Sequence, residues 1–197
     1  MNPFTHLLVS WIVAIKTTDN LRDRRLVTLA GVAPDLDGLG ILADWAKGGF
    51  STDKYLCYQE YHHWIGHGLP AALGCSILMA VLARRHWRVL GLSFLMFHLH
   101  LLCDLIGSRG PDKSDIWPIF YFGPLSQHPM WMWSHQWQLD GWQNRVFTLI
   151  LFAWSLWIGV RCGETFVAVI NKRVDGVFVE TLQKWAGKTP GGDRRGG

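Results

Sequence analysis

Apolar residues along the chain gather into five segments separated by polar or charged stretches. The segments are Pro3–Ile15, Leu26–Pro34, Leu69–Ala83, Val89–Cys103 and Val146–Val160. Period-two alternation is scarce, so the pattern gives little support for strands. The pattern predicts an all-α, up-and-down helical bundle.

Each segment is shorter than the ~20 residues that a clean transmembrane helix needs. The last three segments reach that length if flanking polar residues join them and the helices tilt, whereas the first two are half-length or interfacial. Charged residues make up 17% of the chain, below the ~25% usual for soluble domains, and twelve residues are Trp. We therefore expect a membrane-embedded bundle. A soluble bundle with deeply buried helices is the alternative.

Two long connections and a C-terminal region complete the chain. The connections Gly38–Tyr61 and Gly107–Gln143 are expected at one end of the bundle, and loops of this length are usually functional. Residues 1–186 are expected to form a single domain, and the Gly-rich, charged residues 187–197 a disordered tail. The stretch Glu164–Trp185 predicts a further helix at the membrane interface. Its expected apolar face comprises Val167, Ile170, Val174, Val177 and Phe178.

Charge and cysteine usage exclude two classes of function. The net charge of +4 comes from short basic clusters near the ends of apolar segments, which argues against nucleic acid as a partner. The four cysteines are scattered without a Cys-x-x-Cys pair, so neither a zinc knuckle nor a redox motif is present.

The strongest chemical pattern is His100-Leu-Leu-Cys-Asp104 near the end of the fourth apolar segment. Residues four apart share one face of a helix, and His and Asp are both good ligands for zinc and similar metals. Ionisable groups at membrane depth are costly and normally functional. A simple His–Asp hydrogen bond inside a core is the alternative interpretation.

Three further patterns supply candidate ligands. Asp35-Leu-Asp37 follows Pro34, which should end the preceding segment at Ala33, and its carboxylates can bind a metal or cap a helix. His6 begins the first apolar segment. The stretch Tyr61-His-His-Trp-Ile-Gly-His67 holds three histidines, which form either part of a site or a surface cluster.

Helices that alternate in direction would place all of these candidates at one end of the bundle. The first would run from His6 to Lys16, and the fourth from Arg88 to His100 and Asp104. The positive-inside rule puts the basic end in the cytoplasm and the ligand end on the non-cytoplasmic side. The basic end would collect Lys16, Arg22, Arg24, Arg25, Arg84, Arg85, Arg88 and Arg161.

These motifs together resemble a known family. Thr5-His6, Pro34-Asp35-Leu36-Asp37, His62-x4-His67, His100-x3-Asp104 and Trp117-Pro118 resemble bacterial inner-membrane proteins, the LexA-regulated membrane-bound metal-dependent hydrolases. The order Asp, His, His-x3-Asp is also similar to the all-helical zinc-dependent phospholipase C superfamily. The resemblance covers about Met1–Phe120 and implies a multi-pass protein of the inner membrane. We expect one or two divalent metal ions, preferably zinc, bound by His6, Asp35, Asp37, His62, His67, His100 and Asp104.

The chain departs from both patterns. The membrane family often has His-Arg-Gly-x-Thr-His where this chain has His62-His-Trp-Ile-Gly-His67, so His63 replaces an Arg. The family spacing makes His62 the ligand, whereas helical spacing pairs His63 with His67. We follow the family spacing and expect His62→Ala to lower metal content and His63→Ala to preserve it. The phospholipase pattern also supplies a His-x3-Glu that this chain lacks, so a third metal is not expected.

The expected function is metal-assisted hydrolysis of a phosphoester, either a small molecule or a lipid. Asp35 or Asp37 would bridge metals or orient the attacking water, and Arg109 would hold an anionic group such as phosphate. The alternatives are a non-enzymatic metal-binding or transport protein and a purely structural membrane protein. Five tryptophans at the same end favour membrane lipid as a partner, chiefly through anchoring. They are Trp117, Trp131, Trp133, Trp137 and Trp142.

Overall fold

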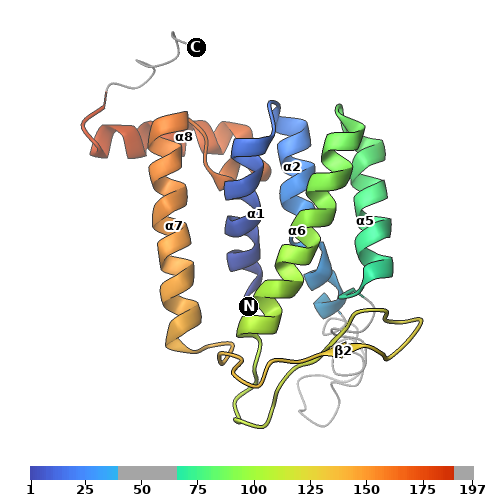
Figure 1. Ribbon diagram of the computed structural model, residues 1–197. Coiled ribbons are helices and arrows are strands. Elements are labelled where there is room, and N and C mark those ends of the chain that lie inside the picture. The colour runs from blue at the N-terminus through green and yellow to red at the C-terminus, as the bar shows by residue number, and fades with distance from the viewer. Residues whose placement is uncertain (40–65, 189–197) are drawn as a thin grey trace, which may run out of the picture.

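The computed structural model describes residues 1–39 and 66–188, and these residues form a helical bundle. Five helices lie roughly along a common axis and alternate in direction, as Figure 1 shows. They are α1 (Pro3–Thr17), α2 (Leu21–Ala30), α5 (Leu69–Leu82), α6 (His86–Gly107) and α7 (Trp142–Cys162). The all-α fold class and the alternating directions expected from the sequence are confirmed.

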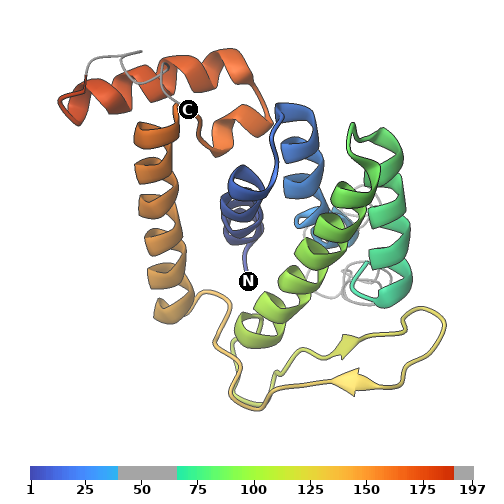
Figure 2. The same ribbon diagram turned by 45° about the horizontal axis from the view of Figure 1, so that its top comes forward.

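Shorter elements close the two ends of the bundle. A 3-10 helix, η1 (Ala33–Leu39), follows α2 at the lower end in Figure 1. The α6–α7 connection crosses the same end and contains a two-residue antiparallel pair, β1 (Ile119–Phe120) with β2 (Met130–Trp131). At the upper end, η3 (Phe166–Val169) leads into α8 (Lys172–Trp185), which lies across the bundle axis (Figure 2).

Local sequence sets where the first helices begin and end. The Asn2 side chain accepts the Thr5 backbone N–H and Pro3 occupies the first turn, a favourable start for α1. Asn20 caps α2 in the same way, so α2 begins at Leu21 rather than at the expected Leu26. The helix ends at Ala30, three residues before the Ala33 boundary expected from Pro34, because the chain turns at Gly31 and continues as η1.

Two helices are long and apolar enough to cross a membrane. They are α6 and α7. The expectation that the Leu69–Ala83 segment also reaches that length is wrong, because α5 stops at Leu82 before the pair Arg84 and Arg85. The expected C-terminal helix is present but shorter than Glu164–Trp185, since η3 and a turn precede α8.

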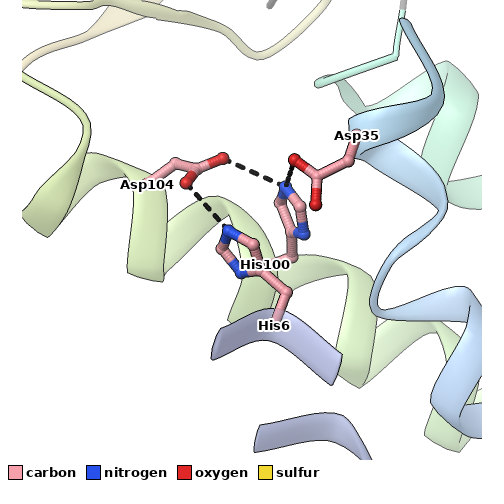
Figure 3. A group of neighbouring side chains, drawn as sticks. All are labelled: His6, Asp35, His100 and Asp104. Atoms are coloured by element: carbon pink, nitrogen blue, oxygen red, sulfur yellow. Dashed lines mark hydrogen bonds and ion pairs between the residues drawn. The ribbon is translucent and has the colours of Figure 1, made fainter. Parts of the chain in front are cut away.

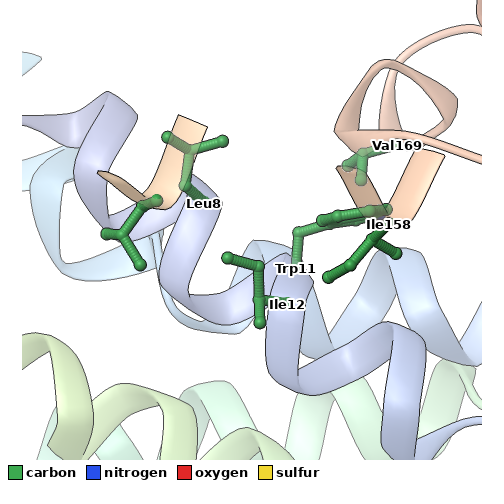
Figure 4. Packing of buried hydrophobic residues seen from close by; sticks show 6 residues of the cluster. Leu8, Trp11, Ile12, Ile158 and Val169 are labelled. Atoms are coloured by element: carbon green, nitrogen blue, oxygen red, sulfur yellow. The ribbon is translucent and has the colours of Figure 1, made fainter. Parts of the chain in front are cut away.

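Three apolar clusters hold the helices together. The first joins α1, α7 and η3 around the fully buried Trp11 (Figure 4). The second joins α1, α2 and α6 around Val27, Val89 and Met96. The third packs β1 against α5 and α6 through Ile119, so the hairpin is fixed to the bundle.

Candidate metal centre

Four side chains from three separate segments converge at the lower end of the bundle. His100 and Asp104 lie one turn apart on α6, His6 comes from α1 and Asp35 from η1 (Figure 3). Each of the four offers one ligand atom, and these atoms all lie within 4.8 Å of one another. The spacing of four along α6 places its two ligands on one face, as the sequence suggested.

The Asp104 carboxylate is the centre of this group. Its Oδ1 lies 3.1 Å from His6 Nε2, and its Oδ2 lies 3.0 Å from His100 Nε2 and 3.4 Å from His67 Nε2. The Ser108 hydroxyl donates to Oδ1 at 2.9 Å, and the Met1 amino group also contacts Oδ1. Asp104 is 3% exposed, so its charge depends on these partners rather than on water.

His100 is held in one tautomer by a backbone carbonyl. Its Nδ1 donates to the Gly31 carbonyl at 2.9 Å, which leaves the Nε2 lone pair directed into the cluster. There Nε2 lies 3.8 Å from Asp35 Oδ1 and 3.3 Å from His67 Nε2. Metal-binding histidines characteristically donate their second nitrogen to such an outer partner.

His67 adds a third imidazole with a carboxylate behind it. Its Nδ1 lies 2.8 Å from Asp37 Oδ2, while its Nε2 faces His100 and Asp104. Burial lowers the pKa of His67, but the hydrogen bonds to Asp104 and Asp37 outweigh burial and raise the pKa to about 9. A proton on His67 Nε2 is therefore directed at Asp104 Oδ2, the oxygen that a bound metal ion would also use.

Close backbone approach brings η1 and His67 together. A Cβ added at Gly66 would stand 2.8 Å from Asp37 Oδ2 and 2.8 Å from the Pro34 carbonyl oxygen. Residue 66 must therefore lack a side chain for the Asp37–His67 pair to form in this way.

The donor chemistry of the group fits a divalent metal ion. Three imidazole nitrogens and two carboxylates are a ligand set suited to zinc and neighbouring metals. Among the described residues, the buried Asp35 Oδ2 and His6 Nδ1 have no hydrogen-bond partner. No Lys or Arg side chain contacts the four ligand residues within the described part of the chain. Asp104 already contacts the Met1 amino group, so Asp35 Oδ2 and His6 Nδ1 are the atoms of the group that remain available to a bound ion.

The expected site residues are placed as follows. His6, Asp35, His67, His100 and Asp104 converge, and Asp37 contacts His67 Nδ1. Their roles as metal ligands stay predictions. His62 and His63 lie outside the described residues, so their assignment stays a prediction.

Arg109 is tied to the loop that follows α6. Its guanidinium donates to the Gln136 carbonyl at 3.1 Å and to the Asp112 carbonyl at 2.7 Å. Neither bond reaches the cluster. The expected contact with a phosphate stays a prediction.

Sequence reasoning missed the outer partners of the ligands. Ser108 stands four residues after Asp104, at the position that follows the end of α6, so the spacing that linked His100 to Asp104 would also have found it. The Gly31 carbonyl carries no side-chain signal, and only the packing of α2 against α6 reveals it.

Fold and site together define an all-helical protein that has two candidate membrane spans and a His/Asp cluster able to hold a metal ion. Residues 1–175 match the model of the family described as YdjM inner membrane protein, so the chain belongs to that family of inner-membrane proteins. Comparison with curated proteins and with solved structures found no match. The family match agrees with the membrane resemblance noted in the sequence, and it leaves the chemistry to be argued from the site.

Proposed function

We propose that this protein is a metal-dependent hydrolase of the inner membrane that cleaves a phosphoester. The observation that carries the proposal is the buried group of His6, Asp35, His100 and Asp104, whose ligand atoms lie within 4.8 Å of one another. A divalent metal ion held there, with zinc the first candidate, would supply positive charge that polarises a phosphoryl oxygen and acidifies water.

The side chains of the group have two different roles, holding the metal ion and accepting a proton. Asp104 and His100 are fixed by Ser108 and by the Gly31 carbonyl, so they hold their positions without rearrangement. Asp35 is the more exposed carboxylate of the group, with a side chain that is 16% exposed, and its Oδ2 has no partner among the described residues. That oxygen can accept the proton of an attacking water. Water adds to phosphorus, one P–O bond breaks, and the departing alcohol oxygen takes up a proton.

A transport role has less support from the placement of the ligands. Polar groups of an ion pathway would follow the bundle towards both sides of the membrane. The described ligands instead gather at one end, and the other end carries basic side chains paired with acids, such as Arg24 with Glu164.

Metal content and turnover, measured on detergent-purified protein, test the proposal. Wild type should retain metal and hydrolyse bis(p-nitrophenyl) phosphate, and His100→Ala should lose both properties. His86 is the matched control because it lies at the other end of α6 and bonds the Ala80 carbonyl, so His86→Ala should keep both. Metal without turnover in wild type would favour a non-enzymatic metal-binding protein, and absence of metal would refute the centre.

A further inference from the structure

Most of the second part of the α6–α7 connection carries no formally charged side chain. Residues 116–139 include no Asp, Glu, Lys or Arg, whereas the preceding residues 109–115 include Arg109, Asp112, Lys113 and Asp115. We call residues 116–139 the uncharged loop segment. Connecting loops usually face water and are polar, so this composition needs an explanation.

Much of the apolar surface of this segment is exposed. Leu125 is 82% exposed and Met132 is 55% exposed. Phe122, Met130, Trp131, Trp133 and Leu139 are exposed as well. Exposed apolar side chains gathered in one place mark an interaction surface or contact with lipid.

The segment is held firmly on the bundle. Ile119 is buried with Ala72 of α5 and Phe97 of α6. The Tyr121 hydroxyl bonds His98 Nε2 at 3.0 Å, and the Tyr121 ring stacks on Trp131 with centroids 4.3 Å apart. The uncharged loop segment is therefore fixed on α5 and α6, and its exposed apolar side chains lie on the outer surface of the bundle.

The position of the segment identifies what covers it. It follows α6 and precedes α7, the two described helices that are long and apolar enough to cross a membrane. Figure 1 shows it at the end of the bundle where α6 finishes and α7 begins. Trp side chains favour the boundary between lipid and water, and a surface at the ends of two spans lies at that boundary.

The same segment adjoins the candidate metal centre. The Leu69 backbone N–H donates to the Tyr121 carbonyl at 2.6 Å, two residues after His67. A Cβ added at Gly68 would stand 2.9 Å from the carbonyl oxygens of both Tyr121 and Gly123. Only glycine allows the segment to lie this close to the residue after His67.

We propose that the uncharged loop segment docks in the interface of the bilayer that α6 and α7 cross, and that the centre draws its substrate, a phospholipid, from that bilayer. The substrate class rests on the proposed hydrolase, whereas the docking does not. Hydrolysis of a phospholipid consumes one water, breaks one P–O bond and yields an alcohol and a phosphomonoester.

Docking is tested by nitroxide labels read without any assay of activity. Single cysteines replace Leu125 in the segment or Ser114 in the preceding charged stretch, in a chain freed of its four native cysteines and reconstituted in phosphatidylethanolamine–phosphatidylglycerol vesicles. The label at 125 should collide more with oxygen than with a neutral nickel chelate, and the label at 114 should show the reverse. Equal access of the nickel chelate to both labels would overturn the docking and leave a soluble protein partner as the occupant.

The substrate class is tested by adding charge to the surface. Leu125→Glu combined with Met132→Glu should lower turnover of vesicle phospholipid by about tenfold or more, since carboxylates resist burial in lipid. Turnover of bis(p-nitrophenyl) phosphate and bound metal should stay at wild-type values, and Ser114→Glu should change none of the three. Equal loss on both substrates, or wild-type hydrolysis of the soluble diester alone, would overturn the lipid assignment. Failure of wild type on both would refute the hydrolase, while the nitroxide result still decides docking.

Discussion

The two ends of the bundle bury carboxylates in different ways. At the upper end, Asp23 accepts from the backbone N–H groups of Arg84 and Arg85 and from the Asn20 side chain. Glu164 and Asp175 there are bonded through both oxygens, Glu164 by Arg24 and Lys172. At the lower end, Asp104 faces imidazoles and the described part of the chain leaves Asp35 Oδ2 unbonded.

This difference separates a structural carboxylate from a ligand. A buried charge whose oxygens all accept hydrogen bonds is satisfied by the fold itself and needs nothing more. Acceptor atoms that face one another at about 3 Å, such as His100 Nε2 and Asp104 Oδ2 at 3.0 Å, require a proton or a cation between them. The carboxylates of the upper end are satisfied by the fold, whereas Asp35 Oδ2 at the lower end is the carboxylate oxygen that a bound ion can still use.

The largest expected effect comes from making the same Asp→Asn substitution once at each end of the bundle and comparing the two variants. Asp104→Asn removes the charge that faces all three histidines, so bound metal should fall by more than the ~10–100-fold that loss of an outer partner costs. Asp175→Asn removes a carboxylate that bonds Thr165 and Lys172, so it should lower thermal stability and leave metal content unchanged. Elemental analysis and thermal unfolding of both variants make the comparison, and metal retained in Asp104→Asn would contradict it.

A smaller effect is expected for the carboxylate behind His67. Asp37 orients the imidazole through Nδ1, so Asp37→Asn should weaken metal affinity by about 10–100-fold rather than abolish binding. Competition with a calibrated chelator measures the change. An effect as large as that of Asp104→Asn would mean that Asp37 is itself a ligand, as the sequence first suggested.

At the upper end, Asp23→Ala should destabilise the protein without affecting metal. It leaves the Arg84 and Arg85 N–H groups unsatisfied, at a cost of about 1–3 kcal/mol. Burial raises the pKa of Asp23, but the hydrogen bonds from Arg84, Asn20 and Arg85 lower the pKa further, to a net value below the usual one.

The pH dependence of stability provides a second measurement on Asp23. Because the folded pKa is depressed, the contribution of Asp23 is complete above the unfolded pKa of about 3.9 and disappears as pH falls through the folded value. The difference in unfolding temperature between wild type and Asp23→Ala should therefore shrink on acidification below about pH 4. A difference that grows there would contradict the assignment.

The smallest effect concerns the contact between the hairpin and α6. Tyr121→Phe removes the hydroxyl that bonds His98 but keeps the ring on Trp131, so stability should fall by about 0.5–1.5 kcal/mol. Thermal unfolding measures the change, with Phe120→Tyr at the preceding residue, the last of β1, as a control for altered polarity. A loss of metal in Tyr121→Phe would show that the hairpin also holds the His67 segment in place.

The sequence predicted at which end of the bundle the candidate ligands gather. It did not predict which residues face the centre of the site and which stand behind them. Alternating helix directions and the spacing of His100 and Asp104 were sufficient to bring distant ligands together, because both depend on helix periodicity. The division between Asp35 and Asp37 depends on the turn of η1 and on the close approach of Gly66, which no periodic pattern encodes. The two-residue strands β1 and β2 were also missed, since two residues carry no alternation.

The length of α6 has a consequence for where in a bilayer the chemistry takes place. Its 22 residues rise about 33 Å, close to the ~30 Å thickness of the hydrocarbon layer. His100 and Asp104 stand only two turns and one turn before the end of that rise at Gly107, about 10 Å and 5 Å along the axis. A membrane crossed by α6 would hold the centre just beneath the headgroups, at the depth where the phosphate of a lipid meets its glycerol. The phosphate of a lipid would then reach the centre by moving less than the thickness of one headgroup layer. A solute from the water would have to lose its hydration shell to reach the same depth.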